Sequence, residues 1–328
     1  MHLVLNSYGT ALYVKNGGFL VVAESGEDRL PPERIKTISI ARGTRVSSDA
    51  VLLAIKHEID LLFVDGKGEP AGRVWSNRYG SIATIRKNQL AFVYSPAAVI
   101  WIKELLAHKL NTQSALLLSL RDNGDARLGR ITQRALNAIA DHREKIQSVE
   151  GDLVTDIAPS LRGWEGAASR RYLEAIAAFM PSDYAFSKRS KRPATDRFNA
   201  LLNYGYGMLY GKVEGALIRA GLDPYVGVMH RDDYNRPVLV FDVIERYRVW
   251  VDYVVIHLCR QEALPAEGFT EQEGGGVWLD GIGKRILVQS VNDYLHEVIS
   301  LAGVKRSREE HLKQYAHALA KQMLDFNP

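Results

Sequence analysis

Among the side chains between residues 161 and 252 that could hold a cation or move a proton, four stand in apolar surroundings. Glu165 falls in LRGWEGAASRRYLEA, His230 follows the apolar run YVGVM, and Asp242 and Glu245 stand three residues apart in RPVLVFDVIERYRVWVD. Carboxylates and imidazole are common ligands of divalent cations. A lone histidine is usually structural, and a spaced acidic pair usually faces solvent. Their density in apolar surroundings favours one metal site formed by Glu165, His230 and Glu245.

Glu165 is expected on the packed side of a helix. The pattern predicts this helix over residues 161–179, after a connector at 156–160, and Glu165 shares its face with apolar residues such as Tyr172. A carboxylate in such a place needs a partner, because an unpaired buried charge is unfavourable. A bound cation and an arginine would each satisfy it, and the sequence leaves both open.

Basic residues gather close to these side chains. The formal net charge is only +4, with an isoelectric point near 9.0, so the distribution of charge is more informative than its sum. Clustered positive charge suits a polyanion such as DNA, although any one cluster is also compatible with a solvated face. The candidate contacts are Lys188, Arg189, Lys191, Arg192, Arg246 and Arg248.

Helical spacing dominates the chain after its first quarter. A helix is expected from Arg197 to Ala220, ended by Gly221, and further helices are expected at 286–301 and in the amphipathic C-terminal segment. The glycines at 205, 207 and 211 each lower helix stability by about 1 kcal/mol relative to alanine. We therefore expect another backbone, of a helix or of a nucleic acid, to approach this helix closely.

The first part of the chain has strand periodicity instead. Short apolar runs flank the turn Asn16–Gly17–Gly18, which is a hairpin signal, and residues 48–56 predict one short helix. The sequence therefore predicts an α+β protein, with a β-rich, sandwich-like domain at 1–85 and a mainly α-helical domain at 86–328.

Composition excludes several classes of protein. The single cysteine, Cys259, cannot form an intrachain disulfide or a thiolate zinc site. No signal peptide and no run of about 18 apolar residues is present, so we expect a cytoplasmic protein without a membrane partner.

Three ordered segments resemble the CRISPR-associated integrase and endonuclease family called Cas one, written Cas1. WEGAASRRYLEA resembles its glutamate helix, KRPATDRFNALLNYGYGMLYGKVEGALIRAGLDPYVGVMH its long central signature, and RPVLVFDVIERYRVWVD its acidic segment. GKGEPAGRV, at 66–74, resembles the end of the family's β domain. The resemblance covers nearly the whole chain and extends to the order of a β-rich domain followed by a helical one.

The resemblance implies a metal-dependent DNA endonuclease and integrase. Its ligands of Mg²⁺ or Mn²⁺ would be Glu165, His230 and Glu245, with Asp242 assisting, and Glu245 stands where some members have aspartate. The implied reaction inserts short DNA fragments, called spacers, into a CRISPR repeat array when a 3′-hydroxyl attacks a phosphodiester. His230 is expected as a ligand, with a proton shuttle as the alternative.

The resemblance also implies partners. These are double-stranded DNA, a second copy of the chain in a homodimer, and the small CRISPR-associated partner called Cas two (Cas2), which would bridge two dimers. Because two strand transfers need two active sites, a symmetric oligomer follows from the reaction, with the β-rich domain as its dimerisation element. Two other classes stay open: a non-catalytic DNA-binding structural subunit, and a general metal-dependent repair nuclease.

Overall fold

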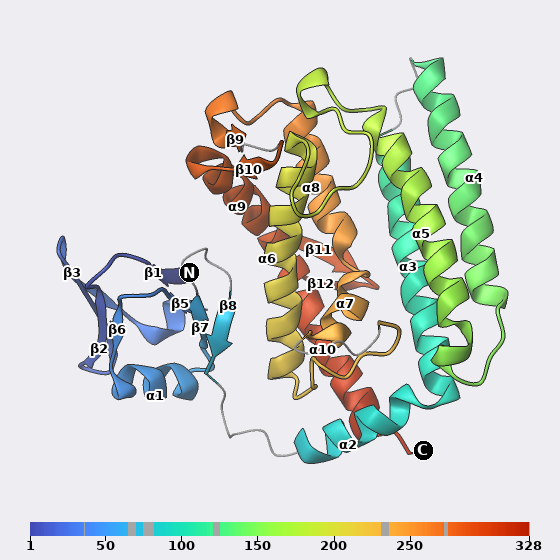
Figure 1. Cartoon of the computed structure of the whole chain (residues 1–328). Coiled ribbons are helices and arrows are strands. Elements are labelled where there is room, and N and C mark those ends of the chain that lie inside the picture. Colours follow the sequence, from blue (N-terminus) through green and yellow to red (C-terminus); the bar gives the residue numbers. More distant parts are fainter. Residues whose placement is uncertain are drawn as a thin grey trace. The chain divides into compact units, whose positions relative to one another are not determined.

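Two compact units make up the chain, Met1–Gly80 and Ser81–Pro328 (Figure 1). The computed structural model describes residues 1–35, 37–64, 70–74, 82–120, 125–230, 236–271 and 275–327. The first unit contains most of the strands and the second most of the helices, so the predicted α+β class is confirmed. The division precedes the helix at Ile82–Val93, slightly before the expected boundary at residue 85. Residues 66–69 of the segment that resembles the β-domain end lie outside the described residues.

Over its described residues, the first unit consists of two four-stranded sheets and one α-helix. One sheet has the order β1 (His2–Leu5), β5 (Thr37–Ile40), β7 (Asp60–Val64), β8 (Pro70–Arg73), with β1, β5 and β7 parallel. The other has the order β4 (Gly26–Leu30), β3 (Gly18–Ala23), β2 (Ala11–Lys15), β6 (Arg45–Val46). A 3₁₀ turn, η1, spans Pro32–Arg34, and helix α1 spans Ser48–Lys56.

Both sheets and α1 share one core. Alternating residues such as Leu3, Leu12 and Ile38 point into it, together with Ala50 of the helix. The hairpin between β2 and β3 turns at Asn16 and Gly17, whose φ angles of 53° and 75° match the two-residue turn that this dipeptide favours. The sandwich-like β domain predicted from the sequence is confirmed.

The second unit is helical apart from two short hairpins, as far as the structure describes it. Its α-helices are α2 (Ile82–Val93), α3 (Pro96–Ser119), α4 (Ala126–Ser148), α5 (Val154–Ala177), α6 (Arg197–Arg219), α7 (Val238–Ile244), α8 (Arg248–Arg260), α9 (Gly281–His296) and α10 (Arg308–Leu324). The hairpins join β9 (Phe269–Glu271) to β10 (Val277–Leu279) and β11 (Val298–Leu301) to β12 (Val304–Ser307), and 3₁₀ turns lie at η2 (Ser182–Tyr184) and η3 (Ala266–Gly268).

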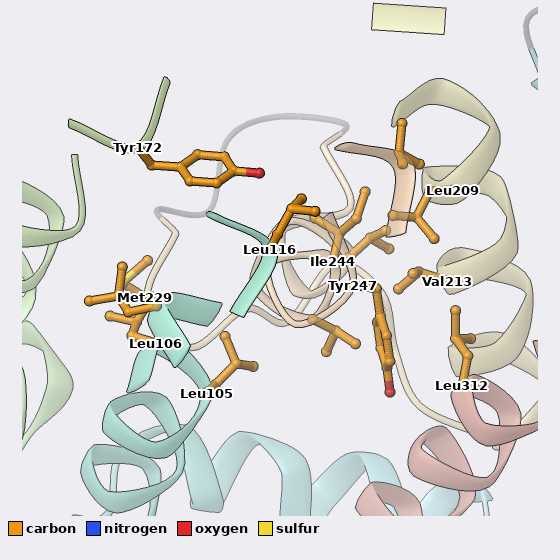
Figure 2. Packing of buried hydrophobic residues seen from close by; sticks show 14 of the residues in the cluster. Leu105, Leu106, Leu116, Tyr172, Leu209, Val213, Met229, Ile244, Tyr247 and Leu312 are labelled. Atoms are coloured by element: carbon orange, nitrogen blue, oxygen red, sulfur yellow. The ribbon is translucent and has the colours of Figure 1, made fainter. Parts of the chain in front are cut away.

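Helices α3, α4 and α5 pack side by side, and α6 packs on α7, α8 and α10 (Figure 1). Their apolar faces meet in one core to which Leu106, Tyr172, Val213 and Ile244 contribute (Figure 2). In the described part of the chain no single helix is long and apolar enough to cross a membrane; only α2 and α3, bent by 84° at their junction, reach that length and composition together. Cys259 is buried in this core.

Two predicted elements were wrong. The connector expected at 156–160 is helical, because α5 begins at Val154 and Pro159 lies inside it. The backbone N–H of Leu153 donates to the Asp156 carboxylate at 2.9 Å, which stabilises this early start. The helix expected at 286–301 begins at Gly281 and ends at His296, and β11 follows.

Of the three helical glycines noted in the sequence, one meets a neighbour. A Cβ at Gly205 would lie 2.6 Å from Cγ1 of Val251 on α8, whereas nothing lies within 4 Å of a Cβ at Gly207 or Gly211. The close approach expected on this helix is therefore confined to Gly205, and it is made by a side chain.

Candidate active site

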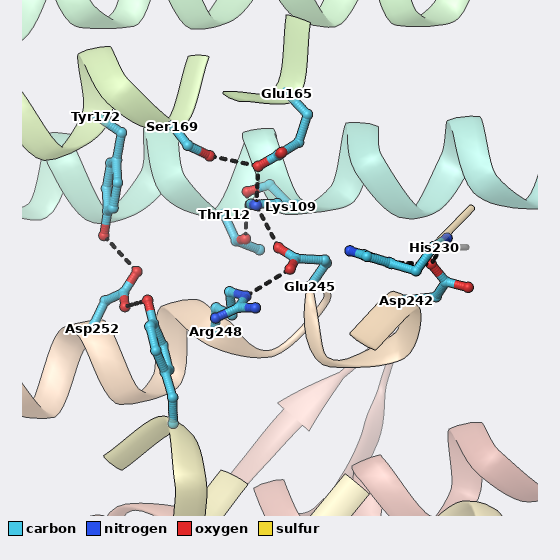
Figure 3. A network of polar contacts seen from close by, with 11 residues as sticks. Lys109, Thr112, Glu165, Ser169, Tyr172, His230, Asp242, Glu245, Arg248 and Asp252 are labelled. Carbon is cyan, nitrogen blue, oxygen red and sulfur yellow. Dashed lines mark hydrogen bonds and ion pairs between the residues drawn. The ribbon is translucent and has the colours of Figure 1, made fainter. Parts of the chain in front are cut away.

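The four chemically capable side chains come from three places in the helical unit. Glu165 lies on α5, His230 lies in the segment between α6 and α7, and Asp242 and Glu245 lie at the end of α7. Figure 3 shows them grouped with residues of α3 and α8. The fold therefore brings together side chains that the sequence separates by tens of residues.

Asp242 is fully buried and holds the backbone that carries His230. Its Oδ2 accepts from the N–H groups of Val228 at 2.6 Å and Met229 at 3.2 Å, and its Oδ1 accepts from the N–H of His230 at 3.2 Å. The same Oδ1 lies 2.7 Å from Nδ1 of the His230 ring. Because a carboxylate only accepts, Nδ1 is the protonated nitrogen in the neutral form of the ring, and the lone pair of Nε2 is then available.

His230 is therefore oriented in the way that suits a ligand. Its side chain is 35% exposed, and Figure 3 shows the ring edge that carries Nε2 turned toward Glu245. A carboxylate behind a histidine fixes the tautomer and makes the distal nitrogen more basic. This geometry is compatible with both roles considered for His230, ligand and proton shuttle.

Glu165 and Glu245 converge on one cation, Lys109 of α3. The Lys109 ammonium donates to Oε1 of Glu165 and to Oε2 of Glu245, and its side chain is only 6% exposed. Ser169 donates to the same Oε1 of Glu165 at 2.8 Å. The side chain that pairs with Glu165 in this structure is thus a lysine, not the arginine considered from the sequence.

Arg248 is the second cation of the group. Its Nε donates to Oε1 of Glu245 at 2.7 Å, and its guanidinium lies over the Tyr206 ring, 4.7 Å from the centroid. Burial disfavours the charged form of Glu245, but Arg248 and then Lys109 outweigh it and lower its pKa from 4.5 to about 2. Burial likewise opposes the charge of Lys109, yet Glu245 and Glu165 raise its pKa. The charged forms of Glu245 and Lys109 thus stabilise each other.

A buried hydrogen-bond network adjoins this cluster. Asp252 of α8 accepts from the hydroxyls of Tyr172 at 3.0 Å and Tyr206 at 2.5 Å. Burial raises the pKa of Asp252, although both hydroxyls favour its ionised form. Since Tyr206 also lies against Arg248, the network fixes the guanidinium that contacts Glu245.

Sequence reasoning missed Lys109, although a signal was present. In ELLAHKLNTQ the lysine follows Leu105 by four residues and Leu106 by three, so it lies on the apolar face of its helix. A lysine there needs an anionic partner for the same reason as Glu165. Nothing local indicates that the partners are 56 and 136 residues away.

The predicted DNA contacts differ in their surroundings. Lys188, Lys191 and Arg192 are exposed, on the loop before α6. Partial burial, followed by the charges of Arg248 and Arg189, lowers the pKa of Lys191.

The other arginines have protein partners. Arg189 donates to Oδ1 of Asn199 at 2.8 Å and also to Asn203. Arg246 lies over the Tyr315 ring, 4.8 Å from its centroid, and Arg248 binds Glu245 as described. Contacts from Arg189, Arg246 and Arg248 to DNA stay predictions. To make them, each arginine would have to share its side chain between DNA and these protein partners.

No three His, Cys, Asp or Glu side chains of the described residues are arranged to hold a metal ion. The reason is visible in Figure 3, where the Lys109 ammonium lies between the two carboxylates. The donor chemistry nevertheless fits a divalent cation: two carboxylates meet at one positive charge, and His230 presents an unprotonated nitrogen. The residues that would hold the metal are Glu165, His230 and Glu245.

Comparison with known proteins identifies the family. The sequence profile described as "CRISPR associated protein Cas1" matches residues 3–293. A protein of Archaeoglobus fulgidus named CRISPR-associated endonuclease Cas1 1 is 32% identical over 307 residues, which cover 90% of this chain and 88% of the relative. One of Rhodospirillum rubrum, named CRISPR-associated endonuclease Cas1 2, is 33% identical over 278 residues, covering 83% and 79%.

Solved structures share the fold. A Cas1 protein from Thermotoga maritima has a TM-score of 0.78 at 20% identity, covering 99% of this chain and 97% of that one. A casposase bound to its integration product has a TM-score of 0.68 at 22% identity, covering 98% and 95%. With the profile match over most of the sequence, these findings show that the chain belongs to the Cas1 family of CRISPR-associated proteins.

Proposed function

We propose that this chain is a metal-dependent DNA integrase that inserts short DNA fragments into a CRISPR repeat array. The observation that carries the proposal is the convergence of Glu165 and Glu245 on one positive charge, beside a His230 ring held by Asp242. The family supports the same activity, since its relatives are named endonucleases and a structural neighbour is a casposase bound to an integration product.

The reaction is a transesterification in which a 3′-hydroxyl attacks a phosphodiester and displaces another 3′-oxygen. A bound Mg²⁺ or Mn²⁺ would neutralise the charge that develops on the phosphoryl oxygens and lower the pKa of the attacking hydroxyl. With water as the attacking group the same residues would support endonuclease activity.

The residues of the chain have separate tasks in this scheme. Glu165 and Glu245 supply anionic oxygens, and His230 supplies a neutral nitrogen, which makes tolerance of Mn²⁺ reasonable. Asp242 is a positioning residue, because all its described contacts are to the backbone and ring that present His230. Arg248 is held by Tyr206 and keeps Glu245 ionised.

DNA would be bound mainly through its phosphates. The exposed side chains of Lys188, Lys191 and Arg192 lie on one loop, directly before α6. Contacts of this kind carry little sequence information and weaken steeply with salt. The repeat array and the spacer precursor would both be double-stranded DNA.

Assembly follows from the reaction. Two strand transfers require two active sites, so we propose a homodimer formed through the β-rich unit. One structural neighbour is described as a Cas6-RT-Cas1–Cas2 complex, and its 22% identity to this chain supports the fold alone. We propose on the family's account that a Cas2 partner bridges two such dimers.

Strand transfer tests the proposal directly. A short duplex with 3′-hydroxyl ends is incubated with a supercoiled repeat plasmid, Mn²⁺ and the chain, with and without Cas2. We expect joined product from wild type, none from His230→Ala, and wild-type product from His317→Ala, an exposed histidine on α10. Metal-dependent cleavage without joining would favour a repair nuclease. DNA binding with neither activity, unchanged in His230→Ala, would leave a structural subunit.

A further inference from the structure

The carboxylate cluster is electrically balanced without any bound ion. Glu165 and Glu245 contribute two negative charges, and Lys109 and Arg248 contribute two positive ones. All four side chains are at most one-quarter exposed, with Lys109 at 6% and Glu245 at 8%. Each buried charge in this cluster therefore has a partner of opposite sign, and none is left uncompensated.

Three of the four glutamate oxygens that a metal could use already accept hydrogen bonds from the chain. Oε1 of Glu245 accepts from Arg248 at 2.7 Å and Oε2 accepts from Lys109. Oε1 of Glu165 accepts from both Lys109 and Ser169. A divalent cation held by both glutamates therefore competes with a cation that the chain itself supplies.

We propose that Lys109 is a resident counter-cation which a divalent metal displaces, so that metal binding at this site is an exchange of cations. The inference rests on the proposed function, because it takes Glu165 and Glu245 as metal ligands. It gives Lys109, which lies outside the three motif segments, a role in setting the affinity of the site for metal.

Lys109, and not Arg248, is the cation that leaves. Lys109 contacts both glutamates, so its movement frees an oxygen on each at once, whereas Arg248 contacts only Glu245. A lysine ammonium is a point charge on a flexible four-carbon chain, whereas a guanidinium is rigid and planar. Arg248 is further held by the face of Tyr206, 4.7 Å away.

The exchange has two consequences. Without metal, Lys109 keeps the two carboxylates together and prevents their mutual repulsion, so the chain is stable in a chelator. With metal, the buried ammonium must find another acceptor, and this requirement weakens metal affinity relative to the same carboxylates without the lysine. Removing the charge of Lys109 should therefore destabilise the metal-free protein and strengthen metal binding.

The test compares Lys109→Met with wild type and with Lys212→Met. Methionine keeps an unbranched chain of similar length without the charge. Lys212 forms another partly buried ion pair, with Glu309 at 3.2 Å, so its variant controls for loss of a lysine–glutamate pair. Calorimetric titration of the full chain with Mn²⁺ gives affinity, and thermal unfolding in EDTA and in Mn²⁺ gives stability.

We expect Lys109→Met to bind Mn²⁺ at least tenfold more tightly than wild type, to melt lower in EDTA and to recover in Mn²⁺. Lys212→Met should bind Mn²⁺ as wild type does. Equal Mn²⁺ affinities in wild type and Lys109→Met would overturn the exchange while leaving the metal site intact. Absence of Mn²⁺ binding from all three proteins would refute the metal site itself, and the exchange with it.

A second measurement on wild type decides the matter if Lys109→Met does not fold. Amine acetylation followed by peptide mass spectrometry reports how accessible each lysine is. Mn²⁺ should raise the labelling rate of Lys109 severalfold and leave that of Lys212 unchanged. An unchanged rate at Lys109 under saturating Mn²⁺ would show that the ammonium stays in place.

Discussion

Replacement of Asp242 by asparagine should destabilise the helical unit and change the tautomer of His230, with the ring proton on Nε2 and no longer on Nδ1. The carboxylate is fully buried and accepts from three backbone N–H groups and one ring nitrogen. Asparagine has the same shape but only one accepting oxygen. Its amide NH₂ must therefore face donors on one side or the other, whichever way it is placed.

The magnitude follows from the two placements. With the amide oxygen toward Val228 and Met229, the NH₂ faces the N–H of His230 and one donor loses its partner. With the oxygen toward His230, two donors lose theirs. Each buried unsatisfied donor is unfavourable by about 1–3 kcal/mol, so the loss is about 1–3 kcal/mol for the first placement and about 2–6 kcal/mol for the second, compared with the 5–15 kcal/mol typical of whole domains.

The first placement is the smaller loss and has a spectroscopic consequence. The His230 nitrogen that faces the amide NH₂ must accept, so the ring proton moves to Nε2 and that nitrogen can no longer bind a metal. Urea unfolding measures stability, ¹⁵N chemical shifts of the ring report the tautomer, and Mn²⁺ titration reports affinity. Asp141→Asn, in an exposed pair with Lys145, is the control and should leave stability close to that of wild type.

Two results would refute this reasoning. A stability of Asp242→Asn within 0.5 kcal/mol of wild type, on the scale of an exposed pair, would show that the carboxylate does not hold the 228–230 backbone. An unchanged proton on Nδ1, together with full Mn²⁺ affinity, would show that Asp242 does not set the tautomer. Either finding would remove its assignment as a positioning residue.

Three further outcomes follow from other parts of the structure. Burial and then the charge of Arg246 lower the pKa of His108 from 6.5 to about 4. The contribution of this shift to the stability of the fold is complete above pH 6.5 and is lost as the pH falls toward 4. His108→Gln should flatten that part of the stability–pH curve by about 1–2 kcal/mol after allowance for solvent screening, as measured by urea unfolding. Gly205→Ala should lower the free energy of unfolding by about 1–3 kcal/mol, because its Cβ would overlap Val251. Gly207→Ala should instead raise it by up to about 1 kcal/mol, since nothing lies near its Cβ. Equal effects of the two variants in urea unfolding would contradict the close contact between Gly205 and Val251. Joint replacement of Lys188, Lys191 and Arg192 by alanine should reduce the slope of log DNA affinity against log salt concentration by about 3, as measured by fluorescence anisotropy. As a control, alanine at the exposed Arg127, Arg130 and Arg134 of α4 should leave this slope unchanged.

Local patterns in the sequence were sufficient for much of the fold. The Asn16–Gly17 turn specifies its hairpin through backbone conformations that these two residues favour, and α1 begins and ends where its pattern predicts. The hairpin between β11 and β12 was missed for a related reason. It turns at Ala302 and Gly303, with φ of 49° and 80°, and alanine rarely adopts a positive φ.

The grouping of Glu165, His230 and Glu245 was predictable from the sequence, whereas their positively charged partners were not. Asp242 and Glu245 lie on one short helix, so their proximity follows from spacing alone. Lys109 reaches Glu245 across 136 residues of sequence, and only the packing of α3 against α5 and α8 brings them together. The contact of Arg248, by contrast, could have been expected from the sequence. An arginine three residues after a buried glutamate is as well placed to neutralise that glutamate as to bind DNA.

The charge balance also bears on the order in which partners bind. Exchange of the single charge of Lys109 for the double charge of a metal ion adds one positive charge between Glu165 and Glu245 and leaves the displaced ammonium nearby. A phosphodiester is a natural acceptor for that excess, whereas water alone compensates it less well in a buried place. Metal should therefore bind more tightly when DNA is present, and by linkage DNA should bind more tightly by the same factor when metal is present. A cluster that is neutral without metal therefore favours binding of metal and DNA together over binding of either one alone.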